Sequence, residues 1–406
     1  MSRLLLLLPA AGYTNQEFIA AAARLDIELV ACADYCHKLA PGWGLPPLMS
    51  VPFDQPDVAL PQVLQALDRP VDAVLATDDH GLALAARLRT ALGLPGSPPE
   101  AVATLADKLR FRQLQQAVGL PHPAFASVGA DDLEAAAAPG FPLVVKARRL
   151  TGSRGVLRAD DIHQLAQALT QVQRIQSRAQ RDADELLVEA FIPGVEVALD
   201  GVLGRGRLRV LAVFDKPDPL DGPAFEETLL VTPSRLPAAV QDELATAVEH
   251  ACASAGVSEG VVHAEARINE SGVWLLEIAP RGIGGLCGRV LDTTLGTGSA
   301  EIVLRHAVGL PLPQQQSDTA AGVMMIPIPA KGIFHGVDGL DAARAVPHIS
   351  GVEITAHPGQ LVAPPPEGSG YLGFIFSHAA TPADAEAALR TAHATLVLKI
   401  QPLLRP

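Results

Sequence analysis

The chain has 406 residues, of which 49% are hydrophobic and 18% charged, and its formal net charge is −13. This length predicts two or three domains, each large enough to bury its own core. The acidic balance argues against a nucleic-acid-binding protein, because such a protein needs a basic surface to displace counterions from phosphates. No apolar run reaches the length of a membrane span, so we expect no membrane partner.

The cysteines and the N-terminal residues indicate the cellular compartment in which we expect the protein. The cysteines form neither a C-x-x-C pair nor a zinc-binding spacing, so we expect free thiols in a reducing cytoplasm. They are Cys32, Cys36, Cys252 and Cys287. The apolar run from Leu4 to Leu8 is short for the core of a signal peptide, and a helical pattern follows it closely. We therefore expect a buried first strand.

Residues 1–105 alternate short apolar runs with helical periodicity. Strands are expected at RLLLLLPA, IELVACA and DAVLATDD, and helices at NQEFIAAAARL, LPQVLQAL and GLALAARLRTALG. This order predicts βαβ units around a parallel sheet. The segment PAAGYTN lacks G-x-G-x-x-G, so no dinucleotide is expected there, and GLPGSPPEAV is interpreted as a crossing between domains.

From Asp107 onward the pattern changes to a helix, DKLRFRQLQQAVG, followed by pairs of strands with glycine-rich joints. A second helix is expected at LPAAVQDELATAVEHACASAG. Beyond about Pro311 a segment rich in proline and glycine carries strands such as AGVMMIPIP and ends in a helix, TPADAEAALRTAHATLVLKI.

The segment GVVHAEARINESGVWLLEIAPR predicts a hairpin whose loop is the five residues NESGV. Placing the apolar rows on one buried face fixes the register. It pairs Ala264 with Ile278, Ala266 with Leu276, and Ile268 with Trp274. The opposite face then carries Glu265 directly across from Glu277.

Two carboxylates about 4 Å apart repel by roughly 4 kcal/mol at an effective dielectric constant near 20. A bound cation would relieve this repulsion, and two acids on adjacent strands suit Mg²⁺ with water and phosphate oxygens completing its shell. The spacing leaves an alternative open, in which one acid forms a structural ion pair with Arg267 or Arg281.

Three other segments offer weaker signals. Lys146 ends a strand before the turn TGSRG, whose backbone N–H groups could cradle phosphate oxygens, although most such turns are only hairpin loops. The bent segment VEAFIPGVEVALDG could offer backbone groups to a planar base, or could be a strand that crosses between domains. Lys108 on its helix could bind a phosphate or could be an ordinary solvated charge.

The order of these motifs resembles the ATP-grasp superfamily, and within it the carboxylate–amine ligases, which include bacterial L-amino-acid (dipeptide) ligases. The motifs are ADKLRFRQLQQAVGLPHP, FPLVVKARRLTGSRGV, LLVEAFIPGVE, VVHAEARI and LLEIAPRGIGG, and the resemblance covers nearly the whole chain. It implies an α/β fold with a Rossmann-like parallel-sheet domain at 1–105, an ATP-grasp region at 106–310 and a C-terminal α+β domain at 311–406. The nucleotide-binding lid would span about 106–190, and the protein would be a cytoplasmic homodimer.

The resemblance also implies roles for residues at the matching motifs. The residues expected to bind ATP are Lys108, Lys146, Gly152, Ser153, Gly155, Glu189, Ala190, Phe191, Ile192 and Glu196. Those expected to bind the substrate or its acyl phosphate are Glu227, Arg281, Gly284 and Gly285. Glu265 and Glu277 would hold Mg²⁺, with Mn²⁺ as a substitute. Lys146 and Arg281 would act directly in catalysis.

The reaction implied by the resemblance joins a small-molecule carboxylate to an amine. The carboxylate attacks the γ-phosphate to give an acyl phosphate and ADP, and the amine then displaces phosphate. Many family members carry Asn two residues after the second metal-binding Glu, where this chain has Ala279, so one or two Mg²⁺ ions are expected. His263 is expected to hydrogen-bond near Glu265, and Lys216 and Glu226 to contact substrate or solvent.

Two other functions remain open at this point. The same fold could use its acyl phosphate as a carboxylase or as a formyl-transferring purine-type ligase. A chain of another class would bind the nucleotide without catalysing a reaction.

Overall fold

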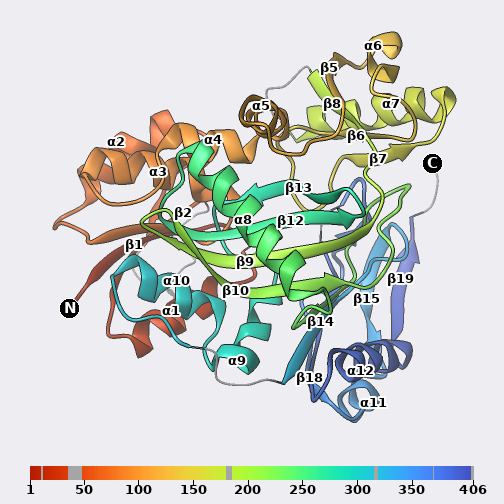
Figure 1. Ribbon diagram of the computed structural model, residues 1–406. Coiled ribbons are helices and arrows are strands. Elements are labelled where there is room, and N and C mark those ends of the chain that lie inside the picture. The colour runs from red at the N-terminus through yellow and green to blue at the C-terminus, as the bar shows by residue number, and fades with distance from the viewer. Residues whose placement is uncertain (11, 35–47, 180–184, 315–318, 369, 404–406) are drawn as a thin grey trace.

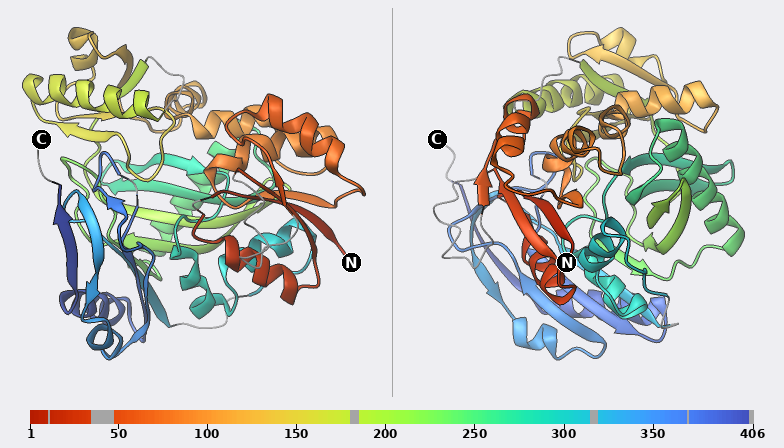
Figure 2. Two further views of the ribbon diagram at one scale, coloured as in Figure 1. Left: turned by 180° about the vertical axis from the view of Figure 1, so that it is seen from behind. Right: turned by 90° about the vertical axis from the view of Figure 1, so that its left-hand side faces the viewer.

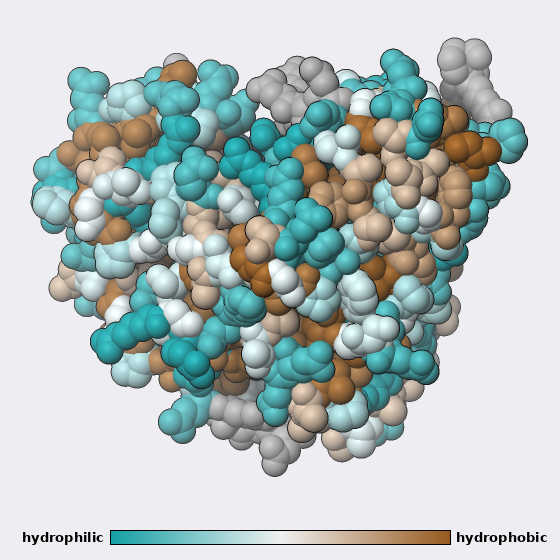
Figure 3. Space-filling view, turned by 45° about the horizontal axis from the view of Figure 1, so that its top comes forward, coloured by the Kyte–Doolittle hydropathy of each residue, from teal (hydrophilic) through white to brown (hydrophobic). Residues whose placement is uncertain are grey.

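The computed structural model describes residues 1–10, 12–34, 48–179, 185–314, 319–368 and 370–403. Figure 1 shows the N-terminal elements at the left, a lid above the central sheet and the C-terminal helices below it at the right. The view from behind in Figure 2 gives the same arrangement, with the lid and the C-terminal strands on one side of the molecule. On the face drawn in Figure 3, hydrophobic residues lie in small patches among hydrophilic ones, as on ordinary protein surfaces.

The N-terminal region is a parallel sheet with helices on both faces, as predicted. Its elements are β1 (Arg3–Leu8), α1 (Asn15–Arg24), β2 (Glu28–Ala33), β3 (Leu48–Ser50), α2 (Pro56–Ala66), β4 (Ala73–Ala76), η2 (Asp79–Gly81) and α3 (Leu82–Leu92). The strand order is β3-β2-β1-β4, and all neighbouring strands are parallel. Leu4 packs in one core cluster with Phe18, and Leu5 packs in another with Val63. The unbroken apolar run of β1 therefore follows from burial on both faces.

The segment interpreted as a crossing between domains contains a further helix. After GLPGSP, α4 (Pro99–Ala106) begins with Pro99 in its first turn, where the missing N–H of proline has no intrahelical partner to lose. It runs directly into α5 (Lys108–Val118), whose N-cap is Asp107. The carboxylate of Asp107 accepts hydrogen bonds from the backbone N–H groups of Leu109 and Arg110. This cap orients Lys108 at the start of α5.

The lid is an antiparallel sheet with one long helix packed on it. Its elements are β5 (Phe125–Gly129), α6 (Leu133–Ala137), β6 (Leu143–Lys146), β7 (Val156–Ala159), α7 (Ile162–Arg178) and β8 (Glu185–Ala190), and the strand order is β5-β8-β6-β7. The helix α7 was not predicted, although Asp161 caps it and buried Leu165, Leu169 and Val172 follow a helical period.

The central sheet has eight strands in the order β13-β12-β9-β10-β11-β14-β18-β16. Its first five strands are β9 (Val195–Gly204), β10 (Arg207–Lys216), β11 (Leu229–Thr232), β12 (Gly260–Asn269) and β13 (Gly272–Ala279). The helices of this region are α8 (Ala238–Ala255), η3 (Cys287–Arg289), α9 (Val290–Leu295) and α10 (Ser299–Ala307). The sheet thus joins strands from both sides of residue 310, while the domain boundaries near residues 105 and 310 stay predictions.

The C-terminal region completes the central sheet and adds a small sheet of its own. Its elements are β14 (Ala320–Ile326), β15 (Gly332–Asp338), α11 (Leu340–Arg344), β16 (Ile349–Ile354), β17 (Leu361–Val362), β18 (Gly373–Ala379), α12 (Pro382–Ala394) and β19 (Val397–Pro402). The last predicted helix was too long, because the chain after Ala394 forms β19 and pairs with β15. Its branched residues Val397 and Ile400 suit an extended strand.

Two further expectations concern the described residues. Cys32, Cys252 and Cys287 are free and buried, whereas Cys36 lies outside the described residues. Within the described part of the chain, none of the helices is both long and apolar enough to cross a membrane.

Candidate active site

The hairpin of β12 and β13 places Glu265 directly opposite Glu277, as predicted. The predicted pairing of Ala264 with Ile278 is also confirmed. Beyond that point the predicted register was wrong, since Ala266 pairs with Leu275 and the turn contains only residues 270–271. The cause is an extra residue in β13 between the pairs made by Glu265 and Ala266.

That extra residue is Leu276, which forms a β-bulge. Leu276 was predicted to lie in the buried row, but it lines the cleft beside Glu277. Val273 and Leu275 take the buried positions instead. The bulge therefore turns two consecutive side chains, one apolar and one acidic, towards the same cleft.

A cleft of about 100 Å³ lies between the lid and the central sheet. The structure brings together here almost all residues expected to bind ATP and metal. They are Lys108, Lys146, Gly152, Ser153, Glu189, Ala190, Phe191, Ile192, Glu196, Glu265 and Glu277, together with Glu227. Sequence reasoning missed five other lining residues, Val144, Val156, Phe225, Arg267 and Leu276. Gly155 does not line the cleft; its backbone N–H donates to the carbonyl of Pro366 instead.

Phe191 forms an aromatic wall of this cleft. Its ring stacks on that of Phe225 with centroids 6.5 Å apart, and the guanidinium carbons of Arg158 and Arg267 lie 4.3 and 4.8 Å from its centroid. Stacked aromatic rings and cations hold each other in fixed orientations. Flat apolar surfaces of this kind suit a planar base.

Lys146 is held in place by a buried acid. The side chain of Glu189 is 2% exposed; it forms an ion pair with Arg112 at 2.7 Å and another with Lys146. Burial alone would raise the pKa of Glu189, but Arg112 and Lys146 together lower it to about 2. The side chain of Glu189 is thus occupied in orienting Lys146, and only the backbone of this residue remains for a ligand.

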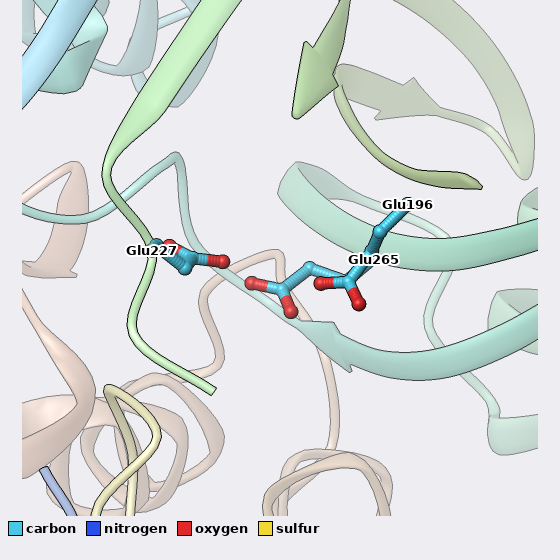
Figure 4. A group of neighbouring side chains, drawn as sticks. All are labelled: Glu196, Glu227 and Glu265. Atoms are coloured by element: carbon cyan, nitrogen blue, oxygen red, sulfur yellow. The ribbon is translucent and has the colours of Figure 1, made fainter. Parts of the chain in front are cut away.

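Lys216 lies among three carboxylates. Its Nζ is 2.9 Å from Glu196 and 3.3 Å from Glu265, and it also contacts Glu227. Figure 4 shows these acidic side chains converging from β9, β12 and the segment before β11. Burial would lower the pKa of Lys216, but the carboxylates raise it well above its ordinary value. The lysine is therefore a fixed positive charge.

The same cluster shifts the pKa of the Glu227 carboxyl group. Burial raises the pKa of Glu227 to about 7, against the attraction of Lys216. The neighbouring Glu226 makes no comparable contact: its Oε1 is buried without a hydrogen-bond partner among the described residues.

His263 connects Glu265 to a buried acid on β9. Its Nδ1 lies 2.7 Å from Asp200 and its Nε2 lies 3.5 Å from Glu265. The second oxygen of Asp200 accepts from the backbone N–H of Ile283 at 3.2 Å. Asp200 therefore links the hairpin of β12 and β13 to the glycine-rich loop that follows it, which the sequence did not indicate.

Arg281 is paired with an acid from the N-terminal region. Its Nε and Nη2 each donate to a carboxylate oxygen of Asp79 at 2.8 Å, and its Nη1 donates to the carbonyl of Gly282. The alternative that Arg281 or Arg267 pairs with Glu265 or Glu277 does not hold. Glu277 lies 3.4 Å from Lys108, and Arg267 pairs with Glu196 and Asp221.

Gly284 and Gly285, in the loop after Arg281, have different surroundings. A Cβ at Gly284 would lie 3.8 Å from Nη1 of Arg281, so this glycine borders the guanidinium. Gly285 has φ of +61°, and a Cβ there would lie 3.0 Å from the ring of Phe374. Backbone conformation and packing both require glycine at Gly285.

Comparisons with known proteins show which domains and proteins the chain resembles. Residues 139–290 match the model of the ATP-grasp domain, and residues 324–401 match that of the L-amino acid ligase C-terminal domain 2. Carnosine synthase 1 of Gallus gallus is 32% identical over 289 residues, which cover 65% of this chain and 30% of that protein. Protein y4rH of Sinorhizobium fredii is 26% identical over 317 residues, covering 76% of this chain and 64% of that protein. The chain thus spans less than two thirds of both relatives.

Solved structures extend the similarity over the full chain. The L-amino acid ligase from Bacillus licheniformis superposes with a TM-score of 0.80 at 24% identity, covering 99% of each chain. A carboxyaminoimidazole ribonucleotide synthase from Aspergillus clavatus, solved with ATP, gives 0.73 at 18% identity, covering 97% of this chain and 98% of that one. At these sequence identities the similarity shows that the fold is shared and nothing more.

Residues 139–290 match the ATP-grasp domain, and the chain has the fold of proteins of the ATP-grasp superfamily, which confirms the predicted fold class. Within that superfamily the chain resembles the carboxylate–amine ligases, since its C-terminal region matches a domain of L-amino acid ligases and its sequence is related to a carnosine synthase.

Proposed function

We propose that the protein is an ATP-dependent ligase that joins an amino acid or small carboxylic acid to an amine and releases ADP and phosphate. The pairing of Glu265 with Glu277 in one cleft with Lys108 and Lys146 carries this proposal. A nucleoside triphosphate with its divalent cation needs both kinds of group: acids for the cation and lysines for the phosphates. Arg281 lies in the loop directly after β13, the strand that carries Glu277. From this position it can bind the carboxylate that attacks the terminal phosphate.

The donor set fits Mg²⁺. Glu265 and Glu277 offer only carboxylate oxygens, which are the ligands that hard divalent cations prefer. Glu196, Glu227 and Glu265 also have ligand atoms within 4.8 Å of one another, but Lys216 contacts all three and already balances part of their charge. When bound, Mg²⁺ would neutralise charge on the phosphate oxygens. One or two ions remain compatible with Ala279, which offers no ligand.

The residues of the chain then position the reacting groups. Lys108 and Lys146 would attract the phosphates, and the flap at Gly152 and Ser153 would cover them. Arg281 uses its Nε edge for Asp79, so the free hydrogens of Nη1 and Nη2 are left for the substrate carboxylate. Attack of that carboxylate on the γ-phosphate gives an acyl phosphate and ADP. The amine then attacks the acyl carbon, phosphate leaves, and a proton is lost from nitrogen.

The test is a phosphate-release screen over pairs of carboxylates and amines, with products identified by mass spectrometry. We expect ADP and phosphate in equal amounts to an amide product, only when both substrates are present. Turnover that requires bicarbonate or formate instead of an amine would identify a carboxylase or formyl-transferring ligase. Production of AMP, or nucleotide binding without turnover in any pair, would overturn the proposal.

A further inference from the structure

Arg112 of α5 has a buried side chain whose place in the site the sequence did not indicate. The side chain is 1% exposed, and its guanidinium makes hydrogen bonds in two directions. Its Nε and Nη2 donate to the two carboxylate oxygens of Glu189 at 2.7 and 3.3 Å. Its Nη1 donates to the side-chain oxygen of Gln115 at 2.7 Å and to the backbone carbonyl of Leu275 at 3.2 Å. One guanidinium therefore joins α5 both to β8 of the lid and to β13 of the central sheet (Figure 1).

The contact with Glu189 extends to Lys146. The carboxylate of Glu189 also forms an ion pair with Lys146, whose side chain lines the cleft. Because Glu189 is 2% exposed, water cannot easily replace a lost partner. The planar guanidinium of Arg112 binds both oxygens of the carboxylate and so fixes its orientation. The direction of the Lys146 side chain thus depends on Arg112, although the two cations do not bind each other.

The contact with Leu275 fixes the strand that carries Glu277. β13 is the outermost strand of the central sheet, so only β12 pairs with it. The carbonyl of Leu275 accepts hydrogen bonds from Arg112 and from Nε2 of Gln115, both at 3.2 Å. This residue directly precedes the bulge at Leu276, where regular pairing with β12 is interrupted. α5 therefore holds β13 two residues before Glu277, at a point where its pairing with β12 is weakened.

We propose that Arg112 is a positioning residue that sets the spacing between Lys146 and Glu277. The inference rests on the proposed function, which assigns Lys146 to the phosphates and Glu277 to the metal ion. Lys108 begins the same helix and lies 3.4 Å from Glu277, so α5 aligns both lysines of the cleft with this acid. A lysine could not replace Arg112, because one ammonium group cannot form a paired contact with a carboxylate and also reach a carbonyl of another strand.

The first test measures kcat and the Mg²⁺ concentration for half-maximal rate in the amide-forming reaction. For Arg112→Lys we expect kcat to fall about tenfold or more and the Mg²⁺ concentration to rise about tenfold, as for loss of a group that orients a metal ligand. Gln115→Leu removes one donor to Leu275 and leaves Glu189 untouched, so it should give a smaller rise. It also keeps the proposal testable where Arg112→Lys does not fold.

Two arginines provide matched controls. Arg3 is a buried arginine of the N-terminal region that pairs with Glu28 at 3.0 Å and with Asp68 at 2.6 Å. Arg3→Lys should lower the melting temperature without changing the Mg²⁺ dependence. Arg110 is exposed on α5 itself, and Arg110→Lys should change neither quantity. A Mg²⁺ dependence of Arg112→Lys equal to that of Arg3→Lys would overturn the proposal.

A second test follows ADP binding by calorimetry and does not require ligase activity. Arg112→Lys should weaken ADP binding about tenfold both with Mg²⁺ and in EDTA, because the paired contact that orients Glu189 and Lys146 is lost. Gln115→Leu should weaken binding with Mg²⁺ but not in EDTA, since it affects the strand of Glu277 alone. These results in a protein that forms no amide would retain the positioning role and reject the ligase. Amide formation with wild-type ADP binding and Mg²⁺ dependence in both variants would reject the positioning role alone.

Discussion

Arg281 and Asp79 form a two-pronged ion pair across 202 residues of sequence, with both donor–acceptor distances at 2.8 Å. The pair joins the loop after β13 to η2 of the N-terminal region. Desolvation would lower the pKa of Arg281, but Asp79 raises it above its ordinary range. The guanidinium is therefore permanently charged and fixed in orientation.

Substitution of Asp79 tests whether this orientation matters. In Asp79→Ala, Arg281 loses the partner of its Nε edge, and we expect KM for the carboxylate substrate to rise tenfold to about a hundredfold. KM for ATP should stay near the wild-type value, and Asp79→Glu should recover part of the loss. Asp57→Ala serves as the control, because Asp57 pairs with Arg87 at the surface. An unchanged KM for the carboxylate would contradict a positioning role for Asp79.

Glu277→Gln tests the metal assignment. The substitution keeps the size of the side chain but removes one negative charge from the pair with Glu265. We expect kcat to fall by about a hundredfold or more and the Mg²⁺ concentration for half-maximal rate to rise. Glu270→Gln, in the exposed turn of the same hairpin, should leave both quantities unchanged. Normal turnover by Glu277→Gln would remove Glu277 from the metal site.

Lys216→Met should convert the glutamate cluster into a stronger cation site. Without the ammonium, Glu196, Glu227 and Glu265 repel one another, and part of that repulsion can be relieved by a divalent cation. We expect the melting temperature of Lys216→Met to fall in EDTA and to recover with Mn²⁺ or Mg²⁺. The wild-type protein without nucleotide should respond much less. A similar response in both proteins would show that Lys216 does not compete with a metal.

Acid pH should weaken the lid through Glu189. Its pKa is depressed from 4.5 to about 2, so its contribution to stability is complete above pH 4.5 and is lost as the pH falls towards 2. Each pH unit below 4.5 removes about 1.4 kcal/mol. Urea unfolding followed from about pH 5 to about pH 3 should therefore show a steeper loss for the wild type than for Glu189→Gln.

Two features make the comparison for Glu189 specific. Glu189→Gln should be less stable than the wild type at neutral pH, because Arg112 would stay buried without its acidic partner. Glu185→Gln is the matched control, since Glu185 is an exposed acid on the same strand. Parallel pH profiles of the wild type and Glu189→Gln would refute the assignment.

The sequence allowed prediction of the features that follow from local patterns. The apolar run from Leu4 to Leu8 predicted a buried strand. The alternation of polar and apolar residues in β12 and β13 predicted that Glu265 lies directly opposite Glu277. A single inserted residue is invisible to such a pattern, so the register beyond Glu265 was wrong and Leu276 was placed on the wrong face. The shared order of five motifs, and not any one of them, indicated the ATP-grasp fold.

Contacts between distant segments could not be predicted in this way. Asp79, Asp200 and Lys216 acquire their roles only when separate regions meet, and each taken alone is an ordinary charged residue. The place of Arg112 between the lid and β13 likewise arises from the packing of α5 against both. The spacing of charged residues along the sequence does not show which distant segments pack together.

The bulge at Leu276 means that this hairpin could lose one residue and keep its opposed acids. Deleting Leu276 would restore strict alternation in β13, with Leu275 still opposite Ala266 and Glu277 still opposite Glu265. The other side chains of β13 would keep their faces, and only the apolar side chain beside Glu277 would be lost from the cleft. The exposed turn at 270–271 should likewise tolerate changes of length.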